Sequence, residues 1–486
     1  MTGYLLRSSR HNWSFKSEPV PALRGRRIDW PRGKLVGGSS AINGMVYARG
    51  LASDYDRWAQ IGLTDWSWDK VRPVFEDLEA PTDQGEPIDH IAVDLPNWWT
   101  PLYDAFLNAS QTAGLGLTDD FNGPAPSGAG RYRFTTYRGR RAHTARTYLK
   151  PALATGRVAL VPDSTVLGID FVDRRAVGLR MQRGGAKHVV KCRSEIILSA
   201  GTVGSPHLLM LSGIGPGNVL PAAGIPVRLE RDAVGRNLQD HLMVRVEHAA
   251  RVAGPLWKLM RLDRAMIAVA QAALTGTGPA SVFPLLVGGF FKSHPGLDEP
   301  DLQTHFLPAL TSATVRINPF RSPTGGREQD GFFANIARMR PESRGHIEIT
   351  SSDPMATPAI HPNYLDSASD RMILRDGMKL LRHLFEQPAF DDYRGPELAP
   401  GADVQSDDEI DDWIAETAST QYHPVGTCRM GTDPDSVVDS ALRVRGVDGL
   451  RVADASVMPT ITSANTQAPT ILIAEMASRA IIQANM

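Results

Sequence analysis

A short apolar segment that leads directly into a glycine turn and a helix is the feature that most constrains this fold. Residues 195–198 read Glu-Ile-Ile-Leu, the composition of a buried strand, and run into Ser-Ala-Gly at 199–201. A helix carrying the apolar side chains of residues 208–211 follows, and Pro206 is expected to open it. A strand, a glycine turn and a helix in this order predict an α/β fold in this region. Such a unit presents backbone N–H groups to a phosphate or a flat ring.

The same order of strand, loop and helix returns at the end of the chain. Leu450–Ala453 is an apolar strand, a loop bounded by prolines follows, and a helix is expected from Pro469 onward. The intervening residues 246–425 have a different hydrophobic pattern. It predicts an alternating strand at Ser343–Thr350 and an amphipathic helix at Asp370–Phe385. We therefore expect one α/β domain assembled from separated segments, with a second domain inserted in it.

Further elements are expected between these landmarks. The expected strands are Ala159–Ser164, Leu167–Val172, Gly178–Gln182 and His188–Lys191, the last two joined across the Gly184-Gly185 turn. Ser406 and Glu409 have the spacing of a capping box, which predicts the start of another helix.

Length and charge bound the class of protein. With 486 residues, the chain exceeds the roughly 250–300 residues at which a single hydrophobic core stops growing, so more than one domain is expected. Basic residues number 52 and acidic residues 53, which leaves a net charge of −1. A nucleic-acid partner is therefore not expected, because nucleic-acid binders usually carry a basic excess.

Three long stretches without charged residues, at 196–227, 265–291 and 455–474, are each interrupted by Gly, Pro or polar residues. No transmembrane segment is expected, since a helical span needs about 20 consecutive apolar residues. The N-terminal residues also lack the apolar core of a signal peptide.

Cys192 and Cys428 build neither a disulfide framework nor a zinc-binding spacing. We therefore expect no metal and a cytoplasmic location, with association at the inner face of the membrane left open.

Five glycine-rich or polar segments carry residues suited to bind a flat cofactor or to move a proton. They are residues 33–47, 201–215 with the nearby 234–241, 421–431, 450–459 and 460–469. In the first segment, consecutive glycines and serines let the backbone approach a flat ligand closely. In the third, Pro424 and Gly426 constrain the backbone around His423. In the fourth, Asp454 follows a strand, where a carboxylate can accept hydrogen bonds from a ligand hydroxyl. The structural alternatives are a surface Gly/Ser turn, a polar loop and a histidine with satisfied hydrogen bonds.

Taken together, these segments resemble the glucose–methanol–choline (GMC) flavoprotein oxidoreductases. The resemblance rests on the blocks GGSSAING, GTVGSPHLLMLSGIG, GRNLQDH, HPVGTCRMG and VADASVMP, which occur in the family's order between Trp30 and Ala480. It implies an α/β (α+β mixed) fold, with a discontinuous FAD-binding Rossmann-like domain and an inserted substrate domain built on an antiparallel sheet. The FAD-binding domain is expected at 1–72, 155–245 and 426–486, and the substrate domain at 73–154 and 246–425.

One departure concerns the family's opening unit, a strand, a GxGxxG turn and a helix followed by an acidic residue. The chain has five G-x-G occurrences, and none completes the fingerprint, because their sixth positions are Asp119, Arg133, Asn218, Leu220 and Ser281. The first βαβ unit is therefore expected to be missing, which makes the FAD-binding domain N-terminally incomplete. A truncated gene model and a chain that functions without the unit are both left open, and such a chain is expected to bind FAD weakly.

The resemblance implies oxidation of a primary aliphatic or aromatic alcohol to the aldehyde, with hydride transfer to flavin N5. It implies His423 as the base that takes the hydroxyl proton and Asn465 as its partner. The helix expected from Pro469 would turn its N-terminus toward the flavin and stabilise the charge of the reduced ring. The residues implied to contact FAD are Gly38, Asn43, Gly44, Met45, Val46, Val166 and Asp454.

Other functions compete with this one. The sequence has no G-x-S-x-G elbow to support a hydrolase and no HExxH-type spacing to support a metalloenzyme. A truncated or inactive paralogue with weak or no FAD binding, and a non-redox lyase of the same family, remain alternatives. The electron acceptor stays open between oxygen, a quinone and another acceptor. Choline is not the expected substrate, because Leu286 stands where choline-specific relatives carry a Glu shortly before a Gly-Phe pair.

Overall fold

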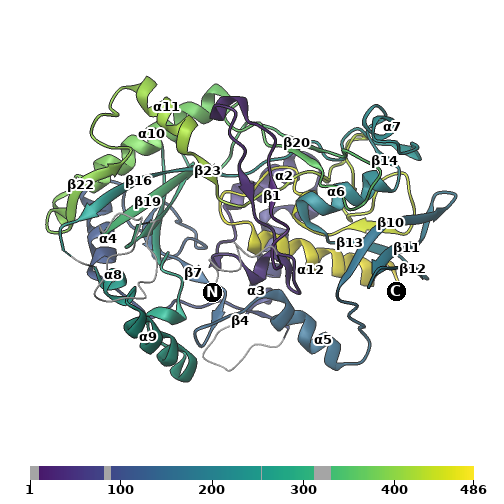
Figure 1. Ribbon diagram of the computed structural model, residues 1–486, viewed down its shortest axis with the longest axis horizontal. Coiled ribbons are helices and arrows are strands. Elements are labelled where there is room, and N and C mark those ends of the chain that lie inside the picture. The colour runs from purple at the N-terminus through teal and green to yellow at the C-terminus, as the bar shows by residue number, and fades with distance from the viewer. Residues whose placement is uncertain (1–9, 81–88, 253, 311–329, 486) are drawn as a thin grey trace.

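The fold has two regions that meet in the middle of the molecule. The computed structural model describes residues 10–80, 89–252, 254–310 and 330–485, so most of the N-terminal stretch inspected for a signal peptide lies outside the described residues. Figure 1 shows a large sheet on one side, a smaller α/β region on the other, and the first described residues running between them. The predicted mixed α/β class is confirmed.

The large sheet is built from strands that lie far apart in the chain. Its strands are β6 (Gly128–Arg131), β16 (Leu242–Ala250), β17 (Val287–Phe291), β18 (Leu302–Leu307), β19 (Gly331–Arg338), β22 (Arg394–Ala399) and β23 (Ser419–Thr420). The order is β22-β16-β19-β18-β17-β6, with β23 paired to β16, and every pairing is antiparallel. An antiparallel sheet was expected for the substrate domain. The expected boundary at residue 245 falls inside β16, and the limits of the two domains stay a prediction.

Helices cover this sheet and connect it to the rest of the fold. Helix α10 (Ala368–Phe385) packs on β16 and β19 through a buried stripe of Leu374, Met378 and Leu381, which recur at helical spacing. Helix α11 (Asp407–Thr417) begins at the capping box of Ser406 and Glu409, as predicted. The other helices described are α2 (Ala52–Gln60), α3 (Trp68–Leu78), α4 (Pro101–Thr112), α5 (Lys150–Ala154), α6 (Gly201–Leu211), α7 (Val219–Ala222), α8 (Pro255–Leu259), α9 (Leu262–Thr275) and α12 (Gln467–Ala484).

Strand β18 separates the hydrophobic core from a polar layer because its side chains alternate between two faces. Phe306 stacks on Phe106 of α4 with 4.9 Å between ring centroids, and it also contacts Phe385 of α10. Gln303 and His305, at the intervening positions of the strand, therefore point to the opposite face. Both are nevertheless buried, so this opposite face is covered as well.

The smaller region contains the predicted strand, turn and helix. Strand β13 (Ile196–Leu198) pairs in parallel with β24 (Leu450–Val452), and α6 follows β13 directly. The expectation that Pro206 opens this helix is wrong, because α6 begins at Gly201 and contains Pro206 in its interior. A proline there leaves the carbonyl of Thr202 without its helical partner. That carbonyl instead accepts a hydrogen bond from Thr427 Oγ1 at 2.6 Å, which explains why the helix tolerates the proline.

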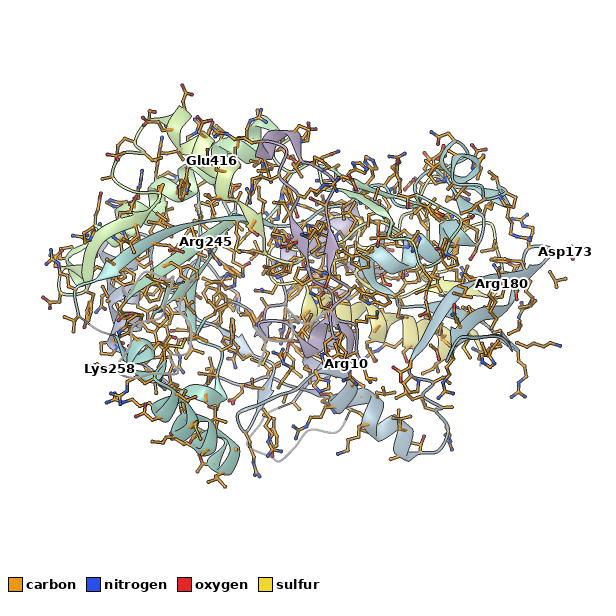
Figure 2. The ribbon with its side chains drawn as sticks, in the orientation of Figure 1. Arg10, Asp173, Arg180, Arg245, Lys258 and Glu416 are labelled. Carbon is orange, nitrogen blue, oxygen red and sulfur yellow. The ribbon has the colours of Figure 1, made fainter. Side chains whose placement is uncertain are left out.

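An antiparallel meander lies beside α6. It comprises β10 (Ser164–Val172), β11 (Arg175–Arg183) and β12 (Ala186–Lys191), and it turns at Gly184-Gly185 as predicted. The strand expected at Ala159–Ser164 is absent from the structure except for its last residue, because the preceding residues are exposed and join no described sheet. Asp173 and Arg180 mark the outer part of this meander (Figure 2).

The remaining strands form short pairs. They are β1 (Phe15–Lys16) with β2 (Asp29–Trp30), β3 (Val46–Tyr47) with β7 (Arg133–Phe134), β4 (Glu79–Ala80) with β5 (Ile91–Ala92), β8 (Thr136–Tyr137) with β9 (Arg140–Arg141), β14 (Ile214–Gly215) with β15 (Leu229–Glu230), and β20 (His346–Glu348) with β21 (Ala359–His361). The strand expected at Ser343–Thr350 is thus shorter than predicted. Across the described parts of the chain, no helix combines the length and apolar character that crossing a membrane requires.

The two faces of β13 predict losses of stability of different size when a side chain is truncated. Leu198 is 5% exposed and Ile197 is 44% exposed, because successive strand residues point to opposite faces. Leu198→Ala should lower the free energy of unfolding by about 2–5 kcal/mol, the usual cost of a cavity in a core. Ile197→Ala should lower it by less than about 1 kcal/mol. Urea unfolding of both variants measures the difference, and equal losses would contradict the described burial.

Candidate active site

His423 and Asn465 lie side by side although they are far apart in the sequence. His423 follows β23 and Asn465 precedes α12, and Asn465 Nδ2 is 3.1 Å from His423 Nε2. Both residues are half-buried. Desolvation, followed by the neighbouring His241, His305 and Arg32, lowers the pKa of His423 well below its ordinary value. The imidazole is therefore neutral at neutral pH and can accept a proton.

Asp240 fixes the backbone at His423. Its Oδ1 atom accepts a hydrogen bond from the His423 N–H at 2.8 Å, and its Oδ2 atom accepts from the hydroxyls of Tyr364 and Thr420. Thr420 Oγ1 in turn accepts from the Tyr422 N–H at 2.6 Å, and Tyr422 lies in the left-handed region with φ 68°. The sequence places Asp240 in the GRNLQDH block, for which a polar loop was the structural alternative, and predicted no role for this residue. The available signal was its place in the GRNLQDH block, directly before a strand.

Gln303 and His305 bring the polar face of β18 to this pair. Gln303 Nε2 donates to Asn465 Oδ1 at 2.9 Å, which leaves the amide Nδ2 of Asn465 facing His423. His305 Nδ1 lies 3.2 Å from Asn335 Oδ1, and burial lowers the pKa of His305 to about 4. Gln303 Oε1 is buried without a hydrogen-bond partner among the described residues. Neither β18 residue was predicted from the sequence, because no local motif marks them.

The glycine block packs against the start of α12. Asn43 Nδ2 donates to Gln467 Oε1, and Arg141 Nη1 donates to Asn43 Oδ1. Gly38 has φ 54°, and a Cβ at that position would find no atom within 4 Å. Gln467 Nε2 is buried with no hydrogen-bond partner in the described part of the chain. A glycine block that is open at Gly38, and is joined through Asn43 to a residue with an unpaired buried donor, suits a flat, polar ligand.

The rest of the block leads from this surface into the fold. Gly44 faces the Phe283 ring, which would lie 3.8 Å from a Cβ at that position. Met45 is half-buried with φ 66°, and Val46 is buried on β3, where it pairs with Phe134. The block is therefore fixed at its C-terminal end and open at Gly38.

Asp454 connects the end of β24 to the start of α6. Its Oδ2 atom accepts hydrogen bonds from Gly201 N at 2.8 Å and Ser205 Oγ at 2.5 Å, and its Oδ1 atom accepts from Ser456 N at 2.8 Å. Val166 is half-buried on β10, and among the described residues no hydrogen bond or ring contact joins it to His423 or to the glycine block. The structure thus gathers the glycine block, His423 and Asn465 near the start of α12, and it does not show Asp454 or Val166 in contact with them.

A separate cluster of ligating side chains lies on the β20–β21 pair. The ligand atoms of His346, Glu348 and His361 all lie within 4.8 Å of one another. Arg236 Nη2 already pairs with Glu348 Oε1 at 3.1 Å, which opposes a bound cation. No motif in the sequence predicted this cluster, although His346 and Glu348 are two residues apart on β20 and so share one face of the strand.

Comparison with known proteins identifies the family. Two family models, each described as GMC oxidoreductase, match residues 16–243 and 341–474. The oxygen-dependent choline dehydrogenase of Rhizobium rhizogenes is 40% identical over 482 residues, which are 97% of this chain and 86% of the relative. The corresponding protein of Sinorhizobium fredii is 41% identical over 486 residues, 98% of this chain and 86% of the relative. The chain belongs to the GMC oxidoreductase family.

Solved structures agree with this assignment. The structure of pyridoxine 4-oxidase from Mesorbium loti matches with a TM-score of 0.84 and 29% identity, covering 98% of this chain and 90% of that chain. A fungal aryl-alcohol oxidase shares the fold, with a TM-score of 0.81 and 23% identity over 97% of this chain and 89% of that chain.

The family assignment confirms the expected enzyme class, an FAD-dependent oxidoreductase that acts on CH–OH donors. The described residues fit such a cofactor. No atom lies within 4 Å of a Cβ placed at Gly38, so the backbone there is open to a ligand, and the unpaired Gln467 Nε2 offers a donor to a ring oxygen or nitrogen. Asn43 belongs to the same glycine block as Gly38 and donates to Gln467 Oε1, so it links this block to α12.

The buried histidines predict a loss of stability in acid. Burial lowers the pKa of His207, His241 and His305 to about 4 in each case. The unfolded chain, with ordinary histidine pKa values near about 6.5, therefore takes up protons first as the pH falls. The free energy of unfolding should be constant above about pH 6.5 and decline toward pH 4, by about 3 kcal/mol for each such histidine.

Urea unfolding at a series of pH values measures this decline. His305→Gln removes one of the titrating groups and should reduce the slope, since fewer protons are taken up on unfolding. A free energy of unfolding that stays level between about pH 7 and pH 5 would show that these histidines are not desolvated.

Proposed function

We propose that this enzyme oxidises a neutral primary alcohol, aliphatic or aromatic, to the aldehyde, with His423 as the base and Asn465 as its partner. The observation that carries the proposal is the contact of 3.1 Å between the neutral His423 ring and the Asn465 amide. An alcohol expels hydride far more readily once its hydroxyl proton is being removed, and a neutral imidazole is suited to take that proton.

The proposed flavin contacts are those implied by the sequence. They are Gly38, Asn43, Gly44, Met45, Val46, Val166 and Asp454. Bound FAD would supply the acceptor for the hydride of the alcohol carbon. The link between Asn43 and Gln467 supports a ring position next to the start of α12, where free backbone N–H groups favour negative charge.

His423 and Asn465 would make different hydrogen bonds to the substrate hydroxyl. Asn465 Nδ2 can donate a hydrogen bond to the hydroxyl oxygen, and His423 Nε2 can accept its proton. The Gln303 amide supports this orientation, because it donates to Asn465 Oδ1 and so keeps the N–H side toward His423. Asp240 supports the position of His423 through its backbone N–H.

Replacing the base should abolish most turnover. His423→Ala should lower kcat for a primary alcohol by about 10²–10⁴-fold, the usual contribution of a general base. Asn465→Ala should cost less, because water can replace part of its hydrogen bond. Steady-state rates, with flavin absorbance per mole of protein as the check on cofactor loading, measure both effects.

The exposed His383 on α10 provides a matched control, and His383→Ala should leave the rate unchanged. A His423→Ala enzyme that loads flavin normally and turns over within about threefold of the native rate would exclude His423 as the base.

The choice of a neutral alcohol rests on the charges near the site. Recognition of a quaternary ammonium needs an aromatic cage or a carboxylate. Leu286, 1% exposed, holds the position at which the resemblance places a Glu in choline-specific relatives. Among the described residues, two buried carboxylates that act on His241 or bind His423 are already engaged. Asp54 is held by Arg340 and Ser463, and Asp240 by the contacts described above.

A pair of substrates of equal shape tests this choice. Choline and 3,3-dimethylbutan-1-ol differ in charge but hardly in volume, so their kcat/KM ratio isolates the ammonium. We expect the neutral alcohol to be the better substrate, because neither of these two carboxylates is left free to face a cation. A higher kcat/KM for choline would reject the proposed substrate class while leaving the role of His423 intact.

The cytoplasmic location expected from the sequence stays a prediction. It is supported by the two cysteines, Cys192 and Cys428, which are both free in the structure.

A further inference from the structure

The direction of one hydrogen bond at His241 is fixed by its partner. His241 lies directly before β16 and is 1% exposed. Its Nε2 atom is 2.8 Å from the carbonyl oxygen of Met339. A carbonyl oxygen can only accept, so His241 Nε2 carries a proton and donates it.

A second hydrogen bond joins His241 to the proposed base. His241 Nδ1 is 2.9 Å from His423 Nδ1, and the two rings are nearly perpendicular, with 88° between their planes. Burial lowers the pKa of His241 to about 4, so at neutral pH the ring holds one proton, and that proton is on Nε2. His241 Nδ1 is therefore the acceptor and His423 Nδ1–H the donor.

We infer that His241 is a positioning residue that holds His423 in the tautomer with its proton on Nδ1 and its lone pair on Nε2, facing Asn465. This inference rests on the proposed function of His423 as the base. The contact at the other end of the ring agrees with it independently. Asn465 Nδ2 carries only hydrogens to donate, so the His423 Nε2 atom 3.1 Å away must be the acceptor.

The tautomer decides whether His423 can act. With the proton on Nδ1, the Nε2 lone pair is available to a substrate hydroxyl. With the proton on Nε2, the ring would present an N–H to that hydroxyl and could not take its proton. When His423 becomes protonated, its Nδ1–H remains bonded to His241, so the imidazolium keeps a partner in a buried site.

The tautomer can be read directly by nitrogen NMR. The full chain is labelled with ¹⁵N-histidine, and the signals missing from the His423→Gln spectrum identify the His423 ring. In the native protein we expect a protonated Nδ1 and an unprotonated Nε2. In His241→Leu we expect a mixture of the two tautomers, because Nδ1 loses its acceptor while Asn465 Nδ2 still faces Nε2. A native spectrum with the proton of His423 on Nε2 would overturn the inference, whether or not His241→Leu folds.

Kinetics of two His241 variants supply the second arm. His241→Leu removes both hydrogen bonds and should lower kcat/KM by about 10- to 100-fold, the usual cost of losing an orienting partner. His241→Gln keeps an acceptor and a donor and should recover most of that loss. Rescue by Gln is the result that a merely structural role, dependent on ring packing, would not give.

His423→Ala, measured alongside, separates the proposed role of His423 as the base from the inferred role of His241 as its positioning residue. If His423→Ala remains active, the proposed function fails. If His423→Ala is inactive while His241→Leu keeps its rate and its Nδ1–H tautomer, the inference about His241 alone fails.

Discussion

The candidate site depends on the hydrogen bonds that Asp240 and His241, two neighbouring residues, make to His423. Asp240 binds the main-chain N–H of His423, and His241 binds its ring and is itself held by the Met339 carbonyl. These groups are buried, so leaving one of them unpaired would cost about 1–3 kcal/mol. Conformations that turn His423 away from Asn465 are therefore disfavoured.

Strand β18 makes this arrangement part of the hydrophobic core. Phe306 on one face packs against α4 and α10, and Gln303 on the other face holds Asn465. Because the strand cannot rotate without exposing Phe306, the amide of Gln303 is held in register with the site. The core thus limits the freedom of Asn465 through a strand that contributes no proposed catalytic group.

Local patterns predicted much of this protein, and long-range contacts account for what they missed. The capping box of α11 and the strand–turn–helix unit around α6 are encoded within a few residues, and both are present. The start of α6 was misplaced because the partner of its interrupted carbonyl, Thr427, lies 225 residues away. His241 and Gln303 were missed for the same reason, since their partners His423 and Asn465 lie 182 and 162 residues away. A motif can mark such residues, but only the folded chain shows which atom faces which.

Burial of the site connects its chemistry to its sensitivity to acid. His241 can orient His423 only while it is neutral, because a second proton would turn both of its nitrogens into donors. The groups that face His241 act in opposite directions: Asp54 and the Met339 carbonyl favour protonation, whereas desolvation and His305 oppose it. Desolvation is the largest of these effects, so the ring stays neutral and its single lone pair points at His423. Desolvation therefore has two effects: it makes the folded protein sensitive to acid, and it keeps His241 neutral, which directs the lone pair of His423 toward Asn465.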